Sequence, residues 1–460
     1  MHDRLAMLTG GARDVPSRQQ TIRGAIDWSY ELLDEAEQRL FRALGVFSGG
    51  WSVDAAESVF PDGHDAVSAL ESFVDKSLVG ETIGPGGESR FAMLETIREY
   101  ASEKLRASGE YDTGAASHAD YYVAFVERFG YSMDEERDFI GLYPILIAEI
   151  DNVRRALSWS CDNANRTLAL RLLAPMWQVW HWLGRQSEGA QWVSRALRIP
   201  GDAPPIVEAH AYRTAANLSL AGADKASNER CRRYYARAAR LYREAGYDAG
   251  VQGCLSNIGI TYANNGELEQ AIRYFTHSYR VARAKDNHGA SRLAVMNLSD
   301  AYFRAGDRAR AVACAKKALE LAHLSGAQSG VCHALYGYAK TLVDVGRLDE
   351  ARPIAREAIE ALIDPQTGVY MAVPMAHCVL LQARLGALAA DHARVGRLLG
   401  IVEALAPIAE LGFDWGHSEM YGRLVSEARS ALGDDVYERE CSTGASMPPE
   451  DIVAFVLSDA

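Results

Sequence analysis

The feature that most constrains the fold of this chain is a pattern that recurs every forty residues. Each copy contains an apolar residue, a glycine four positions later and an alanine nine positions later: Tyr262, Gly266 and Ala271; Tyr302, Gly306 and Ala311; Leu342, Gly346 and Ala351. A further step reaches Gly386, where the pattern weakens because Asp391 replaces the alanine. A fixed period of this length is typical of stacked-repeat architectures.

Each copy predicts two helices joined by a tight turn. The glycine ends the first helix, because it adopts the left-handed backbone conformation without steric cost. The alanine lies in the second helix, where a methyl group allows the two helices to approach closely. The segment Ile258–Phe275 resembles a tetratricopeptide repeat, and a period of forty residues instead of about 34 predicts longer helices.

Composition and charge argue against several classes of protein. The chain has 460 residues and a formal net charge of −13, and residues 1–130 hold 12 Lys and Arg against 22 Asp and Glu. A nucleic-acid surface needs clustered Lys and Arg, so this acidity argues against one. Seven cysteines without paired spacing predict reduced thiols, and the lack of a long apolar run predicts a soluble cytoplasmic protein with no membrane partner.

The N-terminal part has the element order of a winged-helix domain. Asp34 can cap the first of its helices, with Glu37 completing a capping box. The predicted elements are helices Glu35–Phe47, Asp54–Phe60 and His64–Ser77, strands Leu78–Ile83 and Ser89–Leu94, and helix Glu95–Ala107. A helix predicted from Ser17 to Tyr30 is too short to have a core of its own and is interpreted as the remnant of a missing module.

Several segments of the chain resemble the AfsR-like and LuxR-type bacterial signalling ATPases of the STAND class. They are Arg18–Leu33, Leu44–Gly50, Leu70–Leu78, Leu94–Tyr100, Asp151–Leu157, Trp180–Leu197 with Glu188 and Gly189, Leu398–Gly400 and Met447–Leu457. In that family an ATPase module precedes a winged helix and a tetratricopeptide sensor. The resemblance therefore implies the C-terminal portion of such a regulator, without its ATPase.

We predict a mainly α fold, in which a winged-helix domain is followed by a tetratricopeptide-like α-solenoid. The predicted domains are a remnant ATPase helix (1–28), the winged-helix-like domain (29–110), a connecting helix (111–140), the helical repeats (141–433) and a C-terminal cap (434–460). The cap is expected because the end of a solenoid must be covered.

The motifs that carry enzyme chemistry are missing from the sequence. A phosphate-cradling loop needs glycines followed by a lysine, and no Gly-Lys dipeptide occurs. There is also no His-Glu-x-x-His, no Gly-x-Ser-x-Gly and no paired-cysteine zinc spacing. We predict a protein that is not an enzyme and that has no cofactor, no catalytic residue and no metal site.

A winged helix can bind DNA, but the expected reading surface of this one is acidic. The helix that would enter the major groove carries Asp65, Glu71 and Asp75 with Lys76, and the wing carries Glu81 and Glu88 with Arg90. Such a surface would repel phosphates. We therefore predict a packing and regulatory module, with a DNA-binding transcriptional regulator as the alternative hypothesis.

A second alternative is a nucleotide-dependent switch that works only when paired with a separate ATPase module. The related proteins carry a Met-His-Asp motif whose histidine senses bound ADP, and the matching stretch here is Met93, Leu94 and Glu95. Leucine cannot hydrogen-bond a phosphate. Met93 and Leu94 are instead expected to pack as part of the second wing strand.

Two clusters are candidate partner-binding sites. The first is aromatic, and its residues could form a floor for a peptide or instead pack as a core: Trp177, Trp180 and Trp192. The second lies in an arginine-rich helix, which could meet an acidic partner or nucleic acid or instead be a solvated outer face: Arg233, Arg237 and Arg240. We predict a regulatory protein of transcription-linked signalling whose solenoid binds a protein, peptide or small-molecule partner.

Overall fold

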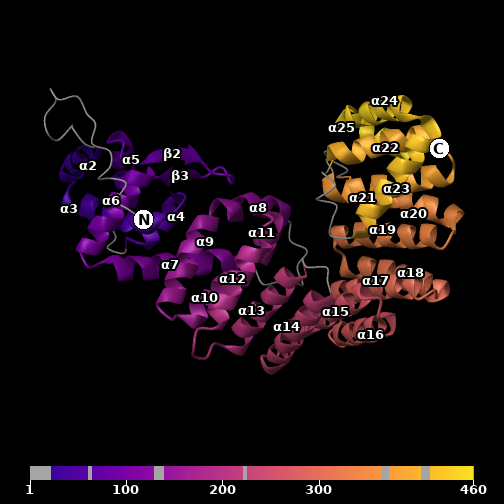
Figure 1. Cartoon of the computed structure of the whole chain (residues 1–460), viewed down its shortest axis with the longest axis horizontal. Coiled ribbons are helices and arrows are strands. Elements are labelled where there is room, and N and C mark those ends of the chain that lie inside the picture. Colours follow the sequence, from indigo (N-terminus) through magenta and orange to yellow (C-terminus); the bar gives the residue numbers. More distant parts are fainter. Residues whose placement is uncertain are drawn as a thin grey trace. The chain divides into compact units, whose positions relative to one another are not determined.

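The computed structural model describes residues 22–60, 65–128, 139–220, 225–363, 372–405 and 415–458, and within them the chain is mainly α-helical (Figure 1). The chain divides into two units, the first extending to Tyr247 and the second beginning at Asp248. The predicted repeat domain, 141–433, is therefore shared between both units. The start of the helix predicted from Ser17 lies outside the described residues.

The winged-helix domain begins with the capping box expected at α3 (Glu35–Ala43). The Asp34 carboxylate accepts a hydrogen bond from the Glu37 N–H at 2.8 Å, and the Glu37 carboxylate accepts one from the Asp34 N–H at 2.9 Å. The remaining elements are the 3-10 helix η2 (Leu44–Val46) and helices α4 (Val53–Ser58), α5 (Ala66–Asp75) and α6 (Glu95–Ala107).

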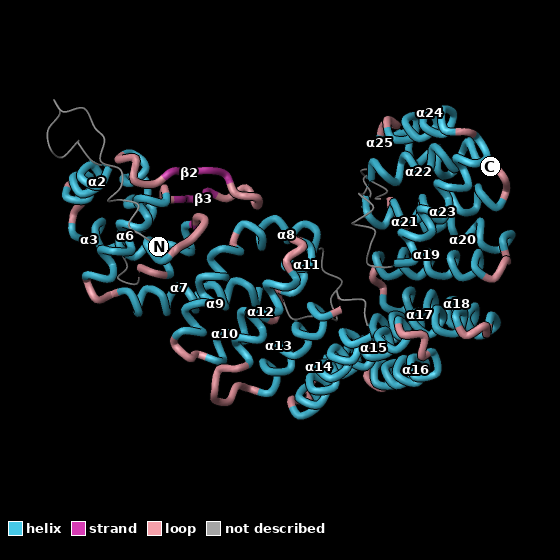
Figure 2. The backbone as a smooth tube through the Cα atoms, viewed as in Figure 1, coloured by secondary structure: helices cyan, strands magenta, loops and turns pink. Residues whose placement is uncertain are grey.

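A three-stranded antiparallel sheet forms the wing, in the order β1-β3-β2. Figure 2 shows its hairpin of β2 and β3. The hairpin of β2 (Gly80–Ile83) and β3 (Ser89–Ala92) lies where the sequence predicts it, whereas β1 (Trp51–Ser52) is too short to show an alternating pattern. The expected packing of Leu94 in the wing is wrong. Strand β3 ends at Ala92, and Leu94 is 73% exposed at the start of α6.

Helix α2 (Ile22–Glu31) packs on the winged-helix core. Ile26 and Tyr30 are buried in the same hydrophobic cluster as the helices of that domain. The Tyr100 hydroxyl of α6 donates a hydrogen bond to Asp27, and Arg23 forms a 2.6 Å ion pair with Glu103. The predicted domain boundary at residue 28 thus falls within a helix that packs against α6.

The rest of unit 1 is a run of packed helices. Helix α7 (Tyr111–Arg128), the predicted connecting helix, packs against α4, α9 and α10, and one hydrophobic cluster extends from Ile26 to Leu218. The helices after α7 are α8 (Phe139–Ala148), α9 (Ile150–Asp162), α10 (Arg166–Leu173), α11 (Trp177–Trp182), α12 (Gln186–Leu197), α13 (Pro205–Ser219) and α14 (Lys225–Glu244). The winged helix and these repeats therefore share a core.

Unit 2 contains the forty-residue repeats as pairs of helices. The first three pairs are α15 (Asp248–Asn264) with α16 (Leu268–Arg283), α17 (His288–Arg304) with α18 (Arg308–Ser325), and α19 (Gln328–Asp344) with α20 (Leu348–Glu360). At each turn the glycine has a φ between 76° and 84°, in the left-handed region. The residue after each glycine donates a 2.9 Å hydrogen bond to the carbonyl of Tyr262, Tyr302 or Leu342.

The fourth pair departs from this turn geometry. It consists of α21 (Ala372–Leu388) and α22 (His392–Leu405), and its left-handed residue is Ala390, with a φ of 62°. Gly386 lies inside α21, where an added Cβ would approach the Val395 side chain to 3.3 Å. This glycine therefore serves close helix packing and does not form the turn.

The chain ends with three helices that pack on the last repeats: α23 (Trp415–Leu432), α24 (Asp434–Ala445) and α25 (Pro449–Leu457). Helix α24 lies so close to α22 that a Cβ on Gly400 would come within 1.9 Å of the Cys441 carbonyl oxygen. Helix α25 packs on α20. Throughout the described ranges, every helix is too short or too polar to cross a membrane.

Candidate functional site

A buried polar network joins the wing to the first helical repeat. The Arg90 guanidinium of β3 forms an ion pair with Glu149, and the two side chains are only 10% and 5% exposed. The Tyr122 hydroxyl of α7 donates to the same carboxylate at 2.7 Å. Burial and the adjacent Glu149 raise the pKa of Tyr122 well above its ordinary value, so the phenol remains a hydrogen-bond donor.

Asn152 extends this network to the loop that precedes β1. Its side-chain carbonyl accepts from the Ser48 N–H at 2.7 Å, and its amide donates to the Gly50 carbonyl and to Glu149 at 2.7 and 2.8 Å. Asn152 is fully buried. It belongs to the segment Asp151–Leu157, so two segments that carry the family resemblance contact each other.

Arg154 contacts a third segment that carries the family resemblance, Trp180–Leu197. Its guanidinium forms a bidentate pair with Glu188 of α12 at 2.5 and 2.7 Å and bonds Asp151 at 2.6 Å. These contacts lower the pKa of Glu188, the hydrogen bond from Arg154 being the largest cause. The geometry can therefore hold the wing, α9 and α12 in one fixed arrangement.

The cations of the expected DNA-reading surface, Arg90 and Lys76, form ion pairs with acidic residues of the protein itself. Arg90 faces Glu149, and the Lys76 ammonium contacts Ser72 and pairs with Glu37 at 3.4 Å. The exposed residues of α5 and its cap include Asp65, Glu71 and Asp75. The described face of this helix is thus no more basic than the sequence indicates.

The tryptophan cluster is mainly core. Trp180 is fully buried and packs so closely on α12 that a Cβ on Gly189 would lie 2.8 Å from its ring. It has no surface to offer a partner, which agrees with the packed-core alternative and not with an aromatic floor. Trp177 and Trp192 are partly buried, and the Arg195 guanidinium lies 5.4 Å from the Trp192 ring.

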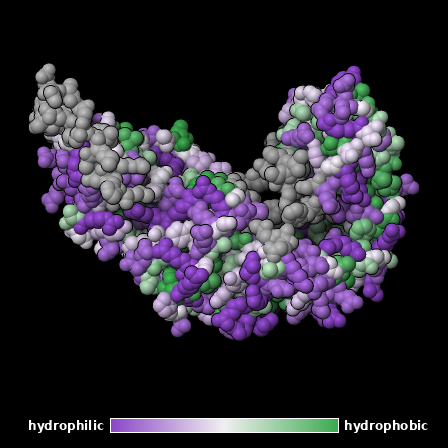
Figure 3. All heavy atoms as spheres, in the orientation of Figure 1, coloured by the Kyte–Doolittle hydropathy of each residue, from purple (hydrophilic) through white to green (hydrophobic). Residues whose placement is uncertain are grey.

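The three candidate arginines lie on one exposed face of α14. Arg230, Arg233, Arg237 and Arg240 follow at intervals of three or four residues, which places them on the same side of a helix. Arg237 lies 5.7 Å from the Tyr212 ring, and Arg240 makes a loose 3.7 Å pair with Glu244. We call these four residues the α14 arginine face. Figure 3 shows mainly hydrophilic residues in this region.

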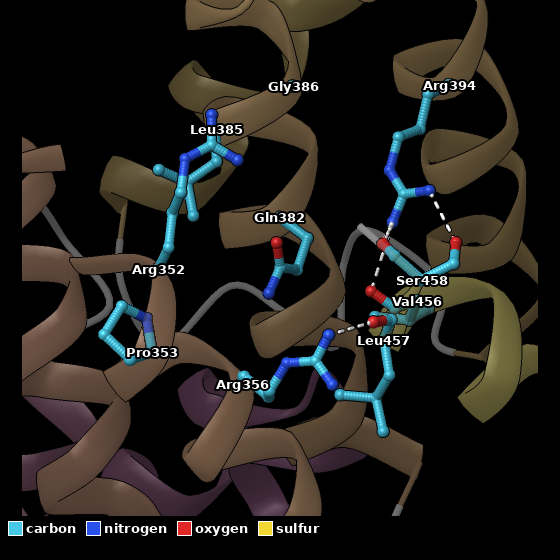
Figure 4. Close-up of a pocket in the computed structure, with 10 residues that line it drawn as sticks. All are labelled: Arg352, Pro353, Arg356, Gln382, Leu385, Gly386, Arg394, Val456, Leu457 and Ser458. Carbon is cyan, nitrogen blue, oxygen red and sulfur yellow. Dashed lines mark hydrogen bonds between the residues drawn. The ribbon is translucent and has the colours of Figure 1, made fainter. Parts of the chain in front are cut away.

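Unit 2 contains a small cavity of about 290 Å³ that the sequence does not reveal. It lies between α20, α21, α22 and the end of α25 (Figure 4). The lining residues are Arg352, Pro353, Arg356, Gln382, Leu385, Gly386, Arg394, Val456, Leu457 and Ser458. We call it the arginine pocket, because three of its side chains are guanidinium groups. The arginines come from two helices and the closing wall from a third, so no local motif marks the site.

Two of these arginines hold the end of α25. Arg356 donates to the Leu457 carbonyl at 2.6 Å, and Arg394 donates to the Ser458 carbonyl at 2.8 Å. Arg394 also bonds the Val456 carbonyl at 3.2 Å.

Among the described residues, no group of three His, Cys, Asp or Glu side chains is placed to hold a metal ion.

Comparison with protein families identifies both predicted modules. Residues 33–106 match a winged helix-turn-helix domain, and residues 251–285 and 289–364 match tetratricopeptide repeats. These matches confirm the predicted fold class. They place the winged helix and the forty-residue repeats in the order in which the sequence predicts them.

Several curated relatives are named as bacterial regulators. The chain is 31% identical over 367 residues to a Mycobacterium tuberculosis protein whose name describes an HTH-type transcriptional regulator, covering 78% of this chain and 41% of that protein. It is 25% identical over 344 residues to the regulatory protein AfsR of Streptomyces coelicolor, covering 66% and 33%. The chain thus spans less than half the length of these relatives.

Solved structures that match the chain have low sequence identity to it. A signal transduction ATPase with numerous domains and a tetratricopeptide repeat sensor from Pyrococcus horikoshii matches with a TM-score of 0.46 and 13% identity, covering 94% of this chain and 68% of that one. The apo quorum sensor NprR from B. thuringiensis matches with a TM-score of 0.45 and 12% identity, covering 78% and 93%.

Proposed function

We propose that this chain, a winged-helix and tetratricopeptide-repeat protein similar to AfsR-like transcriptional regulators, is a non-enzymatic regulator whose repeats recognise a protein partner and transmit that event to the winged helix. The role in transcription-linked regulation follows from the relatives. The partner and its position on the chain are the finer part of the proposal.

The observation that carries the proposal is the α14 arginine face. Helix α14 contains seven Lys and Arg against two Glu, in a chain whose net charge is −13. The face from Arg230 to Arg240 spans about 15 Å along the helix axis. Arginines in this arrangement favour a partner that presents carboxylates, since the guanidinium fork pairs with them bidentately. We therefore assign an acidic protein segment as the partner.

Unit 1 provides a continuous route from this face to the winged helix. Helix α14 packs on α13, α13 on α10, and α10 on α7 and α9. Helices α7 and α9 carry Tyr122 and Asn152 of the buried network that holds the wing. A partner bound to α14 would therefore act on the same packed unit that contains the winged helix, which is the basis for transmission.

The proposal is tested with a triple charge reversal, Arg233→Glu, Arg237→Glu and Arg240→Glu. The control reverses three exposed arginines of α16, Arg273, Arg280 and Arg283, and so changes the net charge equally. Both variants and the native protein are used as bait in a lysate of the native host. Captured proteins are then purified, and their affinity is measured as a function of salt concentration.

We expect a purified partner that binds native protein and the α16 control, and that binds the α14 variant at least about tenfold more weakly. Its affinity should fall with added salt, because exposed charge pairs are screened. Equal affinity of all three proteins for every purified partner would refute the assignment of the α14 face.

DNA binding by the winged helix is the second candidate function, and the winged helix-turn-helix match is the observation that favours it. Gel retardation of random-sequence DNA at low salt distinguishes it, because phosphate contacts give steep salt dependence. We expect no retardation, since Glu71 and Asp75 are exposed and Arg90 is buried. If salt-sensitive retardation is observed and is lost on replacing the α14 arginines, nucleic-acid binding would instead be assigned to α14.

A further inference from the structure

The arginine pocket of unit 2 has the composition of an anion site. The described residues that line it include three arginines and one glutamine but no Asp or Glu. Its volume of about 290 Å³ is just below the range of small-molecule sites, roughly 300–1,000 Å³. The space therefore suits one charged group with a few attached atoms.

The backbone at the end of α25 fixes two of the three guanidinium groups. Arg356 bonds the Leu457 carbonyl, and Arg394 bonds the carbonyls of Val456 and Ser458 (Figure 4). These carbonyls are neutral, so each guanidinium keeps its positive charge while its direction is set. Donors that are oriented before binding lose less entropy when a ligand arrives.

Two further polar side chains of the lining, those of Arg352 and Gln382, offer donors to the cavity. Among the described residues, Arg352 of α20 and Gln382 of α21 make no hydrogen bond or ion pair. Arg352 lies one turn of α20 before Arg356, so both guanidinium groups rise from the same side of the helix. Arg352 is exposed and Gln382 is partly exposed, which leaves the pocket accessible from solvent.

We propose that the arginine pocket binds the anionic group of a ligand, a carboxylate or a phosphate, through Arg352, Arg356 and Gln382. A guanidinium presents two parallel N–H donors to either group, and the Gln382 amide adds a third direction. The site lies in unit 2 and does not depend on the α14 arginine face of unit 1. A result that refutes partner binding at α14 would therefore leave the proposed anion site unaffected, and the reverse also holds.

The test is isothermal titration calorimetry of the whole chain at low ionic strength. Inorganic phosphate and the tricarboxylate tricarballylate are titrated separately. Arg352→Gln removes one pocket cation without touching the contacts of α25. Arg347→Gln is the control, because Arg347 belongs to the same repeat, pairs with Glu350 at 2.5 Å and does not line the pocket. Gln382→Glu places a carboxylate in the cavity.

We expect saturable binding of one anion per chain, weakened at least about tenfold by Arg352→Gln, unchanged by Arg347→Gln and abolished by Gln382→Glu. Tighter binding of phosphate would assign a phosphate-bearing ligand, and tighter binding of tricarballylate a carboxylate. The proposal is overturned if neither anion saturates the protein, or if the two arginine variants weaken binding equally. Circular dichroism of each variant confirms that the helices remain folded.

Discussion

The buried pair between Arg90 and Glu149 should make the connection of the wing to the first repeat sensitive to one substitution. In Arg90→Met the carboxylate of Glu149, whose side chain is 5% exposed, keeps only the neutral donors Tyr122 and Asn152. Removing one partner of a buried ion pair leaves an uncompensated charge and costs about 3–5 kcal/mol. We expect the free energy of unfolding of unit 1 to fall by that amount.

A second substitution separates the buried charge from lost packing. Glu149→Gln in the Arg90→Met background removes the charge but keeps a carbonyl oxygen for Tyr122 and Asn152. Because no ion is then left buried, the double variant should recover about 2 kcal/mol or more of the loss. A packing defect at Arg90 alone would not be relieved in this way.

The assay is urea denaturation followed by circular dichroism, together with hydrogen exchange of the β3 amides. Glu95→Gln is the control, because it breaks the Arg98–Glu95 pair of the same domain, in which Glu95 is 58% exposed. Such a surface pair contributes less than about 1 kcal/mol. The reasoning fails if Arg90→Met costs no more than Glu95→Gln, or if the double variant recovers nothing.

Three further predictions concern stability. Burial lowers the pKa of His118 and of His210 from 6.5 to about 3, so both side chains stay neutral in the folded protein. Protonation of these histidines in the unfolded chain therefore favours unfolding as the pH falls below 6.5. In urea titrations, His118→Phe should remove about 2 kcal/mol of the stability that the protein loses between pH 7.5 and pH 5. Gly259→Ala should cost about 1–3 kcal/mol because its Cβ would lie 2.5 Å from the Phe275 ring, and Phe275→Leu should relieve that cost in thermal melts. Asp34→Ala should cost about 1 kcal/mol by loss of the capping box, whereas an unchanged denaturation midpoint would argue against the cap.

The fold could be predicted where local chemistry determines it. The capping box at Asp34 and the glycine turns at Gly266, Gly306 and Gly346 depend on residues close together in the chain. Gly386 shows the limit of this reasoning. The forty-residue interval leads to this glycine although the pattern weakens there. A glycine is favoured both at a turn and where two helices pack closely, and its position alone does not distinguish the two roles.

The sites could be predicted less well, because they depend on contacts between distant residues. The sequence places Arg90 among the cations of the wing, since its partner Glu149 lies 59 positions later and no local pattern connects them. The arginine pocket combines α20 and α22 with the end of α25, about a hundred residues beyond Arg356. Trp180, by contrast, stood at helical spacing in an apolar segment, which already favoured the core.

The segments that resemble the regulator family have a physical connection that their sequence order conceals. Asp27 of the first bonds Tyr100 of the fourth, Asn152 holds the loop at Ser48, and Arg154 holds Glu188. Five of the eight segments thus supply one side of a contact whose other side lies in another segment. The α14 arginine face lies outside them. The contacts that join the winged helix to the first repeats are therefore separate from the surface that we propose for partner binding.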